Sequence, residues 1–244
     1  MPKLVFELRT MLLLIFAVWW LIWAYQPAHS SDWVLENVLT VSFIVFLART
    51  RNRFRFSNLS YVLIFVFLCL HTIGAHHTYA EVPYESWTAS LGFSLNRLFG
   101  FERNQFDRLV HFLFGFLLCY PVRETFMRIV HVKGAWSYCL PLELVISLSM
   151  LYELIEWLVA TVFGGEFGMA YLGTQGDIRD AHKDMGLASL GAALSMLIVA
   201  LITWKNNRDF MAEMRDSLKI KNTIPLGKVK LHEYKHRRGK QGGG

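Results

Sequence analysis

The sequence gathers ionisable side chains into a short part of an otherwise apolar chain. Glu153 and Glu156 lie within one apolar run, and three further acids, Asp177, Asp180 and Asp184, occupy the following polar loop and the start of the next apolar run. A charge in a lipid-exposed helix is costly, and such residues usually face protein or a water-filled cavity. These acids therefore predict an enclosed polar site that could bind a metal ion or move protons.

Helical spacing extends this predicted site to other runs. Three polar or small-residue stripes each fit one face of a helix. The third requires a helix that starts near Asp177. Lipid cannot solvate such stripes, so they must face protein. Their members are Asn104, Asp107, Arg108, His111 and Gly115; Ser149, Glu153, Glu156 and Ala160; and Asp177, Asp180, Asp184, Ala188, Gly191 and Ser195.

A fourth run contributes histidines with less regular spacing. On a straight helix, where each residue turns roughly 100°, His71 and His76 point about 140° apart. Either Gly74 lets the helix bend, or only one of the two histidines faces the site.

Histidine nitrogens combined with carboxylate oxygens suit zinc, manganese or iron. Asp107 and His111, at i and i+4, offer two ligands on one helical face. We predict a divalent metal site, with Asp180 as the general base for a metal-bound water. Arg108 or Arg179 would hold an anionic headgroup. The predicted metal ligands are His71, His76, Asp107, His111, Glu153, Glu156 and Asp184.

Simpler roles remain for several of these residues. Asp177 and Asp180 could be acids that favour a helix N-terminus. Arg108 could neutralise a neighbouring acid without any catalytic role. His76 and His77 could be hydrogen-bonded anchors at the membrane interface.

Composition indicates a membrane protein. The 244 residues are 54% hydrophobic and 18% charged, whereas soluble domains average about 25% charged residues. The net charge of +6 comes from the C-terminus, because residues 205–244 hold 11 Lys and Arg against 4 Asp and Glu. The basic charge belongs to this tail, so it does not require the whole fold to face an anionic partner, and we predict no nucleic-acid partner.

The apolar segments predict an all-α, polytopic bundle of about six transmembrane helices. Each segment is near the roughly 20 residues that cross a bilayer. Residues 1–205 would form the transmembrane domain, with the first segment retained as a helix, and residues 206–244 a basic cytoplasmic tail. The segments lie at 8–25, 33–48, 59–80, 106–122, 138–163 and 184–204.

The loops predict the orientation. Four arginines fall within residues 49–55, further basic residues fall within 123–133, and residues 26–32 contain no Lys or Arg. The positive-inside rule then places both termini in the cytoplasm. Most of the ionisable residues within the spans fall in the outer half, so we predict a polar pocket that opens outward.

Four motifs resemble an uncharacterised family of multi-pass bacterial inner-membrane proteins, over roughly residues 10–205. That family usually has Trp in place of Arg179 and commonly Gln in place of His182. The resemblance implies a location in the bacterial inner membrane. The motifs are His71-Thr-Ile-Gly-Ala-His-His-Thr-Tyr79, Arg103-Asn-Gln-Phe-Asp-Arg-Leu-Val-His-Phe112, Tyr152-Glu-Leu-Ile-Glu-Trp157 and Tyr171-Leu-Gly-Thr-Gln-Gly-Asp-Ile-Arg-Asp-Ala-His-Lys-Asp-Met185.

The chain is more distantly similar to VanZ-like membrane proteins, which are linked to glycopeptide resistance. Their Asp-x-x-x-His motif matches Asp107 and His111, and their later helical glutamate matches Glu153 or Glu156. Their Asp-x-x-x-Asn pattern resembles residues 180–184, with Asp in place of Asn. The resemblance implies an outward-facing polar site of shared origin and supplies no reaction.

Three functions fit these observations. The first is a metal-dependent membrane enzyme that acts on a lipid or cell-envelope intermediate. The second is a proton- or cation-coupled transporter or permeability factor, in which the same acids titrate; helices broken within the membrane would favour it. The third is a structural membrane protein with a satisfied polar network.

Overall fold

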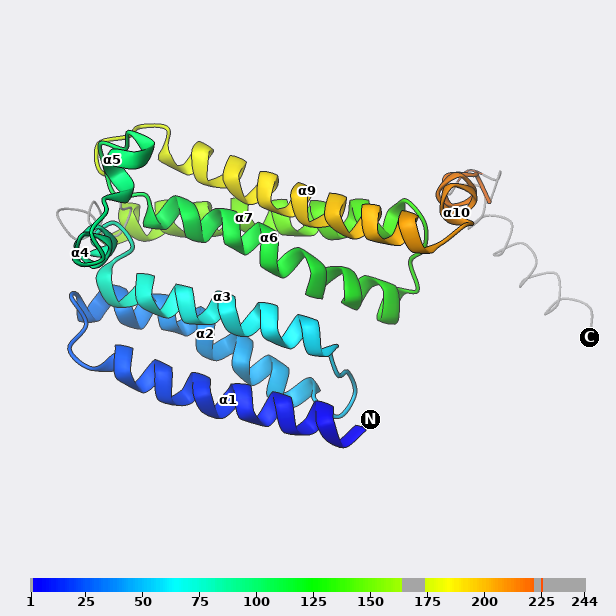
Figure 1. Cartoon of the computed structure of the whole chain (residues 1–244), viewed down its shortest axis with the longest axis horizontal. Helices are drawn as coiled ribbons and strands as arrows, with labels where there is room; N and C mark the ends of the chain where they lie inside the picture. Colours follow the sequence, from blue (N-terminus) through cyan, green and yellow to red (C-terminus); the bar gives the residue numbers. More distant parts are fainter. Residues whose placement is uncertain (1, 164–173, 222–224, 226–244) are drawn as a thin grey trace, which may run out of the picture.

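The computed structural model describes residues 2–163, 174–221 and 225, and of residues 2–7 the backbone alone. Six long helices run along the molecule (Figure 1), and the described residues form no strand. This arrangement confirms the predicted all-α bundle. The long helices are α1 (Pro2–Ala24), α2 (Ser30–Thr50), α3 (Asn58–His77), α6 (Phe106–Thr125), α7 (Trp136–Phe163) and α9 (Asp180–Asn206).

The six predicted segments each correspond to one long helix. Within the described ranges, five helices are long and apolar enough to cross a membrane, and α1 contributes a shorter apolar stretch at Leu8–Ala24. The segment predicted at 59–80 ends earlier, at His77, because Thr78 and Tyr79 adopt left-handed backbone conformations with φ of 55° and 51°. That turn ends the helix and folds Tyr79 back over Gly74, where an added Cβ would overlap the tyrosine ring.

Four short elements lie at the two ends of the bundle. The end that carries α4 (Tyr84–Ser90) and α5 (Leu95–Phe99) is called the site end, and the opposite end, with the arginine-rich α2–α3 loop, the basic end (Figure 1). At the site end, Glu85 accepts hydrogen bonds from the Asn96 amide and the Ser94 hydroxyl, which hold its pKa below the ordinary value. The basic end holds the π-helical turn η1 (Phe126–Val130) and α10 (Phe210–Ser217).

The helix α10 belongs to the predicted C-terminal tail and packs against the start of α7. Ser217 accepts from the Ala135 amide at 2.8 Å through its hydroxyl and from the Trp136 indole at 2.9 Å through its carbonyl. Residues 222–224 and 226–244 of the predicted tail lie outside the described part of the chain.

Small residues let α6 and α9 approach until their backbones meet. A Cβ at Gly115 would overlap the Ala188 backbone, and a Cβ at Gly191 would overlap the Phe112 carbonyl. This is the small-residue packing that brings membrane helices close together. Cys119, Val145 and Ala192 continue the buried core between α6, α7 and α9.

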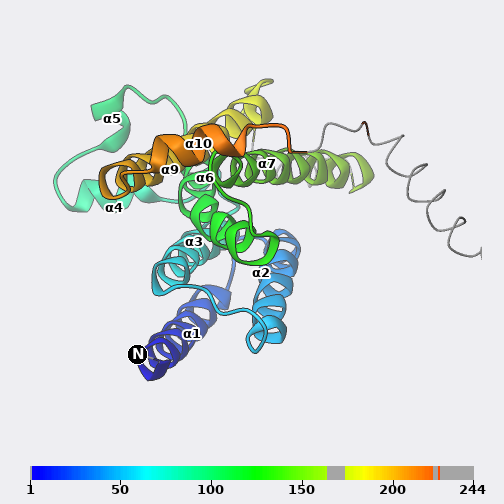
Figure 2. The same ribbon diagram turned by 90° about the vertical axis from the view of Figure 1, so that its right-hand side faces the viewer.

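The first three helices form the other part of the bundle. Phe16 of α1 packs with Ile64 and Leu68 of α3 in a second buried core. The end-on view shows α1, α2 and α3 on one side of α6, with α7 and α9 on the other (Figure 2). The site therefore depends on α6, which separates the two groups of helices.

Candidate functional site

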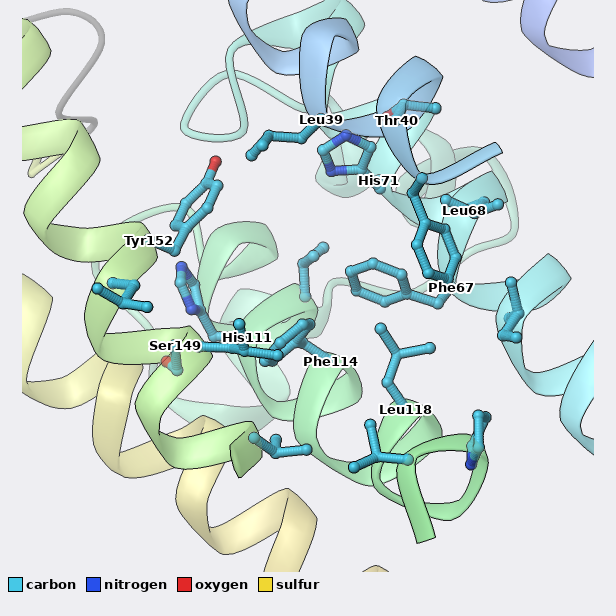
Figure 3. A pocket seen from close by; sticks show the side chains of 18 of the residues that line it. Leu39, Thr40, Phe67, Leu68, His71, His111, Phe114, Leu118, Ser149 and Tyr152 are labelled. Atoms are coloured by element: carbon cyan, nitrogen blue, oxygen red, sulfur yellow. The ribbon is translucent and has the colours of Figure 1, made fainter. Parts of the chain in front are cut away.

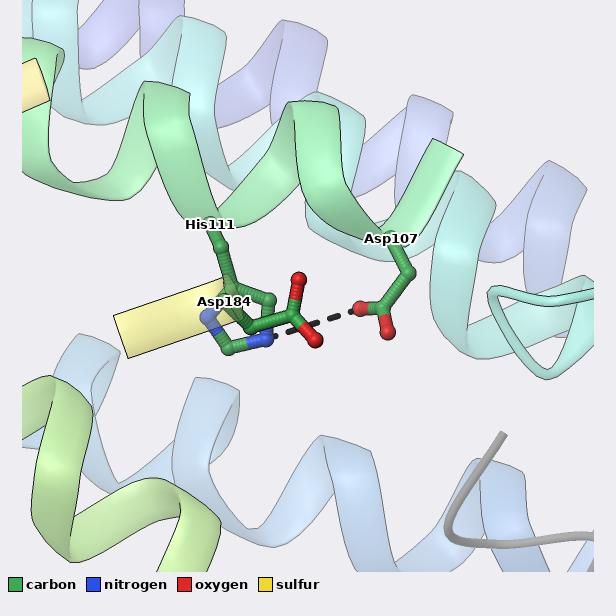
Figure 4. Close-up of side chains that lie close together, drawn as sticks. All are labelled: Asp107, His111 and Asp184. Atoms are coloured by element: carbon green, nitrogen blue, oxygen red, sulfur yellow. Dashed lines mark ion pairs between the residues drawn. The ribbon is translucent and has the colours of Figure 1, made fainter. Parts of the chain in front are cut away.

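A cluster of carboxylates and one histidine lies between α6, α7 and α9 near the site end. One ligand atom each from Asp107, His111 and Asp184 lie within 4.8 Å of one another (Figure 4). The His111 Nε2 atom is 3.5 Å from Asp107 Oδ1 and 3.4 Å from Glu153 Oε1. We call these four residues the carboxylate–histidine cluster.

The packing of α6 against α9 sets the geometry of this cluster. The two helices run in the same direction (Figure 1), and Gly115 of α6 meets Ala188 of α9. His111 precedes Gly115 by one helical turn, and Asp184 precedes Ala188 by one turn. The close backbone contact therefore brings the imidazole and the Asp184 carboxylate to the same level.

Two of the cluster's carboxylate oxygens accept no hydrogen bond from the part of the chain that the structure describes. They are Asp184 Oδ1 and Glu153 Oε1, on side chains that are 3% and 9% exposed, and Glu153 Oε1 has only the 3.4 Å ion-pair contact with His111. Buried polar atoms nearly always have a partner, and an exception calls for an explanation such as an ion. The donor set of one imidazole and three carboxylates suits zinc, manganese or iron.

A layer of ion pairs covers the cluster at the site end. Arg103 donates to both Asp180 carboxylate oxygens at 2.8 and 2.9 Å and to the Thr174 carbonyl at 2.8 Å. Arg108 donates to Asp177 at 2.7 Å and to Asp180 at 3.0 Å. We call Arg103, Arg108, Asp177 and Asp180 the arginine–aspartate layer.

Asp177 occupies the turn before α9. Its carboxylate accepts hydrogen bonds from the Lys183 ammonium at 2.5 Å and the Arg179 amide at 3.1 Å. These bonds, that from Lys183 first, lower the pKa of Asp177 to about 2. The sequence placed Asp177, Asp180 and Asp184 on one helical face only if the helix started near Asp177. The helix α9 begins at Asp180, so Asp177 does not share that face.

The structure separates the predicted catalytic acid from the predicted metal ligands. Asp180 is 3% exposed and accepts from both arginines, so it lies in the arginine–aspartate layer. Glu156 is half-buried on α7, within electrostatic range of Asp107 and Glu153. Arg108 pairs with Asp177 and Asp180, and Arg179 is exposed.

The two predicted histidine ligands of α3 lie apart from the cluster. His71 is buried and hydrogen-bonds the Tyr79 hydroxyl through Nδ1. His76 Nδ1 lies 2.8 Å from the Trp23 carbonyl of α1. Because α3 continues past Gly74 to His77, the two rings point to different neighbours, and neither joins the group of atoms around His111.

Three residues of the site were absent from the predicted set. Arg103 precedes α6 and pairs with Asp180, and Glu36 of α2 accepts from the Tyr152 hydroxyl of α7. Two of them carried a signal in the sequence: Glu36 is an acid within the second apolar run, and Arg103 is the first residue of the motif at 103–112. Helical spacing could not find them, because their partners belong to other helices.

A cavity of about 550 Å³ extends from the cluster toward the basic end (Figure 3). Its ionisable lining gathers at the site end, where His71, Asp107, His111 and Tyr152 contribute side chains. Most of the remaining lining is apolar, with Phe, Leu, Ile and Val side chains from α2, α3, α6 and α7.

Comparison with known proteins agrees with this architecture. A family model described as "Predicted membrane protein (DUF2238)" matches residues 8–205. The chain belongs to this family. The inner membrane protein YjdF of Escherichia coli (strain K12) is 32% identical over 195 residues, which cover 78% of this chain and 88% of the relative. No solved structure matches the chain.

The family, the relative and the apolar helices together identify a multi-pass protein of the bacterial inner membrane. The similarity to VanZ-like proteins is not shown by these comparisons and stays a prediction.

Proposed function

We propose that this protein is a metal-dependent membrane enzyme that acts on a lipid or cell-envelope intermediate. The observation that carries the proposal is the convergence of Asp107, His111 and Asp184 ligand atoms within 4.8 Å. A shared cation would explain why carboxylates from α6, α7 and α9 gather around one imidazole, and why two of them keep an oxygen that accepts no hydrogen bond from the described residues.

The residues divide into three roles in this proposal. Asp107, His111 and Asp184 hold the ion, which would supply Lewis-acid polarisation of the substrate and acidify a bound water. Glu153, 3.4 Å from His111 Nε2, is placed to complete the ligand set or to accept a proton. Asp180 positions the two arginines instead of serving as the base, because its carboxylate already accepts three hydrogen bonds from them.

Arg103 and Arg108 are suited to bind an anionic group at the site end. Guanidinium groups match phosphate and carboxylate geometry, and the buried Nε atoms of both arginines have no hydrogen-bond partner among the residues whose positions are described. The arginine-rich loops at the other end favour a cytoplasmic basic end. The site end would therefore face outward, where envelope intermediates are processed.

Transport by proton or cation coupling is the alternative that the same acids permit. A transport path requires polar groups across the whole membrane depth, as intramembrane relays contain. The ionisable side chains that line the cavity gather at the site end, and Phe114, Leu118 and Val122 line it toward the basic end. This distribution favours the enzyme over the transporter.

Metal analysis of the purified protein tests the proposal. After loading with zinc, manganese or iron and desalting, we expect a stoichiometric metal in the native chain and at least roughly ten-fold less in His111→Ala and Asp184→Asn, because each removes a direct ligand. The matched control is His131→Ala, an exposed histidine at the basic end. A native chain that retains none of the three metals, or a His111→Ala variant that retains the full amount, would overturn the proposal.

A further inference from the structure

The cavity lies at the depth of the hydrocarbon core. Its α6 lining runs from Asp107 to Thr125, a rise of about 27 Å at about 1.5 Å per residue. This length approaches the roughly 30 Å thickness of the bilayer interior. A volume of about 550 Å³ falls within the range of ligand pockets, about 300–1,000 Å³.

One side of the cavity is open between α2 and α7. Leu39 and Phe46 of α2 and Leu148 and Leu151 of α7 line the cavity, yet they remain 44%, 57%, 42% and 49% exposed. These residues belong to membrane-spanning helices, so the medium beside the opening is lipid hydrocarbon. An unfilled void forfeits dispersion contacts along its whole lining. A hydrocarbon chain is the occupant that this medium provides.

The closed end of the cavity is chemically different. Asp107 and His111 line the cavity and also belong to the carboxylate–histidine cluster. The Asp180 carboxylate and the two arginines that pair with it, Arg103 and Arg108, lie within electrostatic range of Asp107. A chain in the cavity would thus bring the polar end of its molecule to the cluster, next to these two ion-paired guanidinium groups.

We propose that the cavity binds one hydrocarbon chain of an anionic membrane lipid, which enters sideways between α2 and α7 and places its headgroup at Asp107 and His111. Binding of the chain stands on the cavity itself. That the bound lipid is the substrate rests on the proposed metal-dependent function.

Photolabelling in proteoliposomes tests the binding. The probe is phosphatidic acid with a diazirine at the end of one acyl chain, and EDTA is present throughout. After illumination and peptide mapping, we expect labelling of Phe43, Leu118 and Leu148 to exceed that of Leu197 several-fold. Leu197 is a suitable reference, because it is 53% exposed on α9 and lies outside the cavity lining. Equal labelling of cavity and reference residues would overturn the proposal.

Two cavity variants sharpen this result. Leu118→Trp fills the cavity, and Leu39→Trp narrows its opening at a position that is 44% exposed and tolerant of size. Both should lower cavity labelling several-fold, whereas Leu197→Trp should leave it unchanged. If neither cavity variant changes labelling, the chain does not occupy this cavity. The partly exposed position of Leu39 keeps the test valid if Leu118→Trp fails to fold.

The headgroup and the chemistry are tested separately. A diazirine phosphatidylcholine probe, with the same chain and a zwitterionic head, should label the cavity several-fold less, and equal labelling by the two probes would refute the anionic preference. Because EDTA is present, cavity labelling without stoichiometric metal in the metal analysis would retain the lipid site and discard the enzyme. Stoichiometric metal without cavity labelling would do the reverse.

Discussion

Tyr152 of α7 donates its hydroxyl between both carboxylate oxygens of Glu36 of α2, each 2.9 Å away. The Tyr152 ring also lies edge-on to His111, with ring centroids 5.8 Å apart. One tyrosine therefore joins the helix at the open side of the cavity to the carboxylate–histidine cluster. Glu36 is 5% exposed, so this hydrogen bond satisfies a buried carboxylate.

Removal of this hydroxyl should loosen α2. Tyr152→Phe keeps the ring and deprives Glu36 of a donor, at an expected loss of about 1–3 kcal/mol in unfolding free energy. Thermal or denaturant unfolding in detergent measures the loss. The control is Tyr25→Phe, at a residue that is 72% exposed, which should change stability by less than about 0.5 kcal/mol. Equal stability of the two variants would contradict a structural role for the Tyr152–Glu36 bond.

The contact between α6 and α9 predicts opposite effects for two glycine substitutions. Gly115→Ala would push a methyl group into the Ala188 backbone, and overpacking of this kind costs about 1–3 kcal/mol. Gly186→Ala, in α9, adds its methyl group to open space and should stabilise the helix by about 0.5–1 kcal/mol. Unfolding measurements should show a lower unfolding free energy for Gly115→Ala and a higher one for Gly186→Ala than for the native chain.

The same pair of variants also tests the geometry of the site. If Gly115→Ala separates the helices, Asp184 moves away from His111, and metal retention should fall with stability. Gly186→Ala should retain the metal that the native chain holds. Full retention by a destabilised Gly115→Ala variant would show that the cluster does not depend on this contact.

Arg103 should contribute strongly to the stability of the fold, although it lies in the loop before α6. Its Nη2 atom donates to both carboxylate oxygens of Asp180, whose side chain is 3% exposed, and its Nη1 atom donates to the Thr174 carbonyl. Removal of one member of a buried ion pair leaves an uncompensated charge and costs about 3–5 kcal/mol. Arg103→Ala should therefore lower the unfolding free energy by roughly that amount, reduced somewhat because Arg103 is 16% exposed.

Two further variants show whether the lost unfolding free energy comes from the ion pair with Asp180. Arg103→Lys should recover only part of the stability, because an ammonium cannot reproduce the paired guanidinium geometry. Arg97→Ala, at an exposed arginine of α5, should be near neutral. A fully stable Arg103→Ala variant would mean that Asp180 is held by Arg108 alone.

Acid should weaken the turn before α9. The Lys183 hydrogen bond, followed by that from the Arg179 amide, lowers the pKa of Asp177 from 3.8 to about 2. Since the folded pKa lies below the unfolded value, the stabilising contribution of Asp177 is present above about pH 4 and is lost as the pH falls toward 2. The melting temperature of the native chain should exceed that of Asp177→Asn by a constant amount at pH 5–7, and the two should converge below pH 4. A difference that persists unchanged to pH 2.5 would contradict the lowered pKa.

Helix number, approximate helix bounds and the association of Asp107, His111 and Asp184 were accessible from the sequence. Apolar length specifies a span, and residues four apart on a helix share a face whatever surrounds it. The position along each helix at which α6 contacts α9 could be predicted only in part. Small residues marked the contact face of α9, but the register of Gly115 against Ala188 depends on how two backbones fit.

The histidines of α3 show why other features were not accessible. Spacing within α3 left two arrangements open for His71 and His76, a bend at Gly74 or a single histidine facing the site. The choice depends on the positions of α1 and α2, which cannot be read from the spacing within α3. The left-handed turn at Thr78 and Tyr79 brings the tyrosine hydroxyl onto His71. The role of Asp180 was obscured in the same way, because its partner Arg103 lies 77 residues earlier in the chain.

The opening between α2 and α7 determines which concentration governs binding in the cavity. A molecule that enters there arrives by diffusion within the plane of the bilayer. Occupancy of the cavity is then governed by the mole fraction of that lipid among its neighbours. Dilution of proteoliposomes with buffer should leave occupancy unchanged, whereas dilution of the membrane with inert lipid should reduce it.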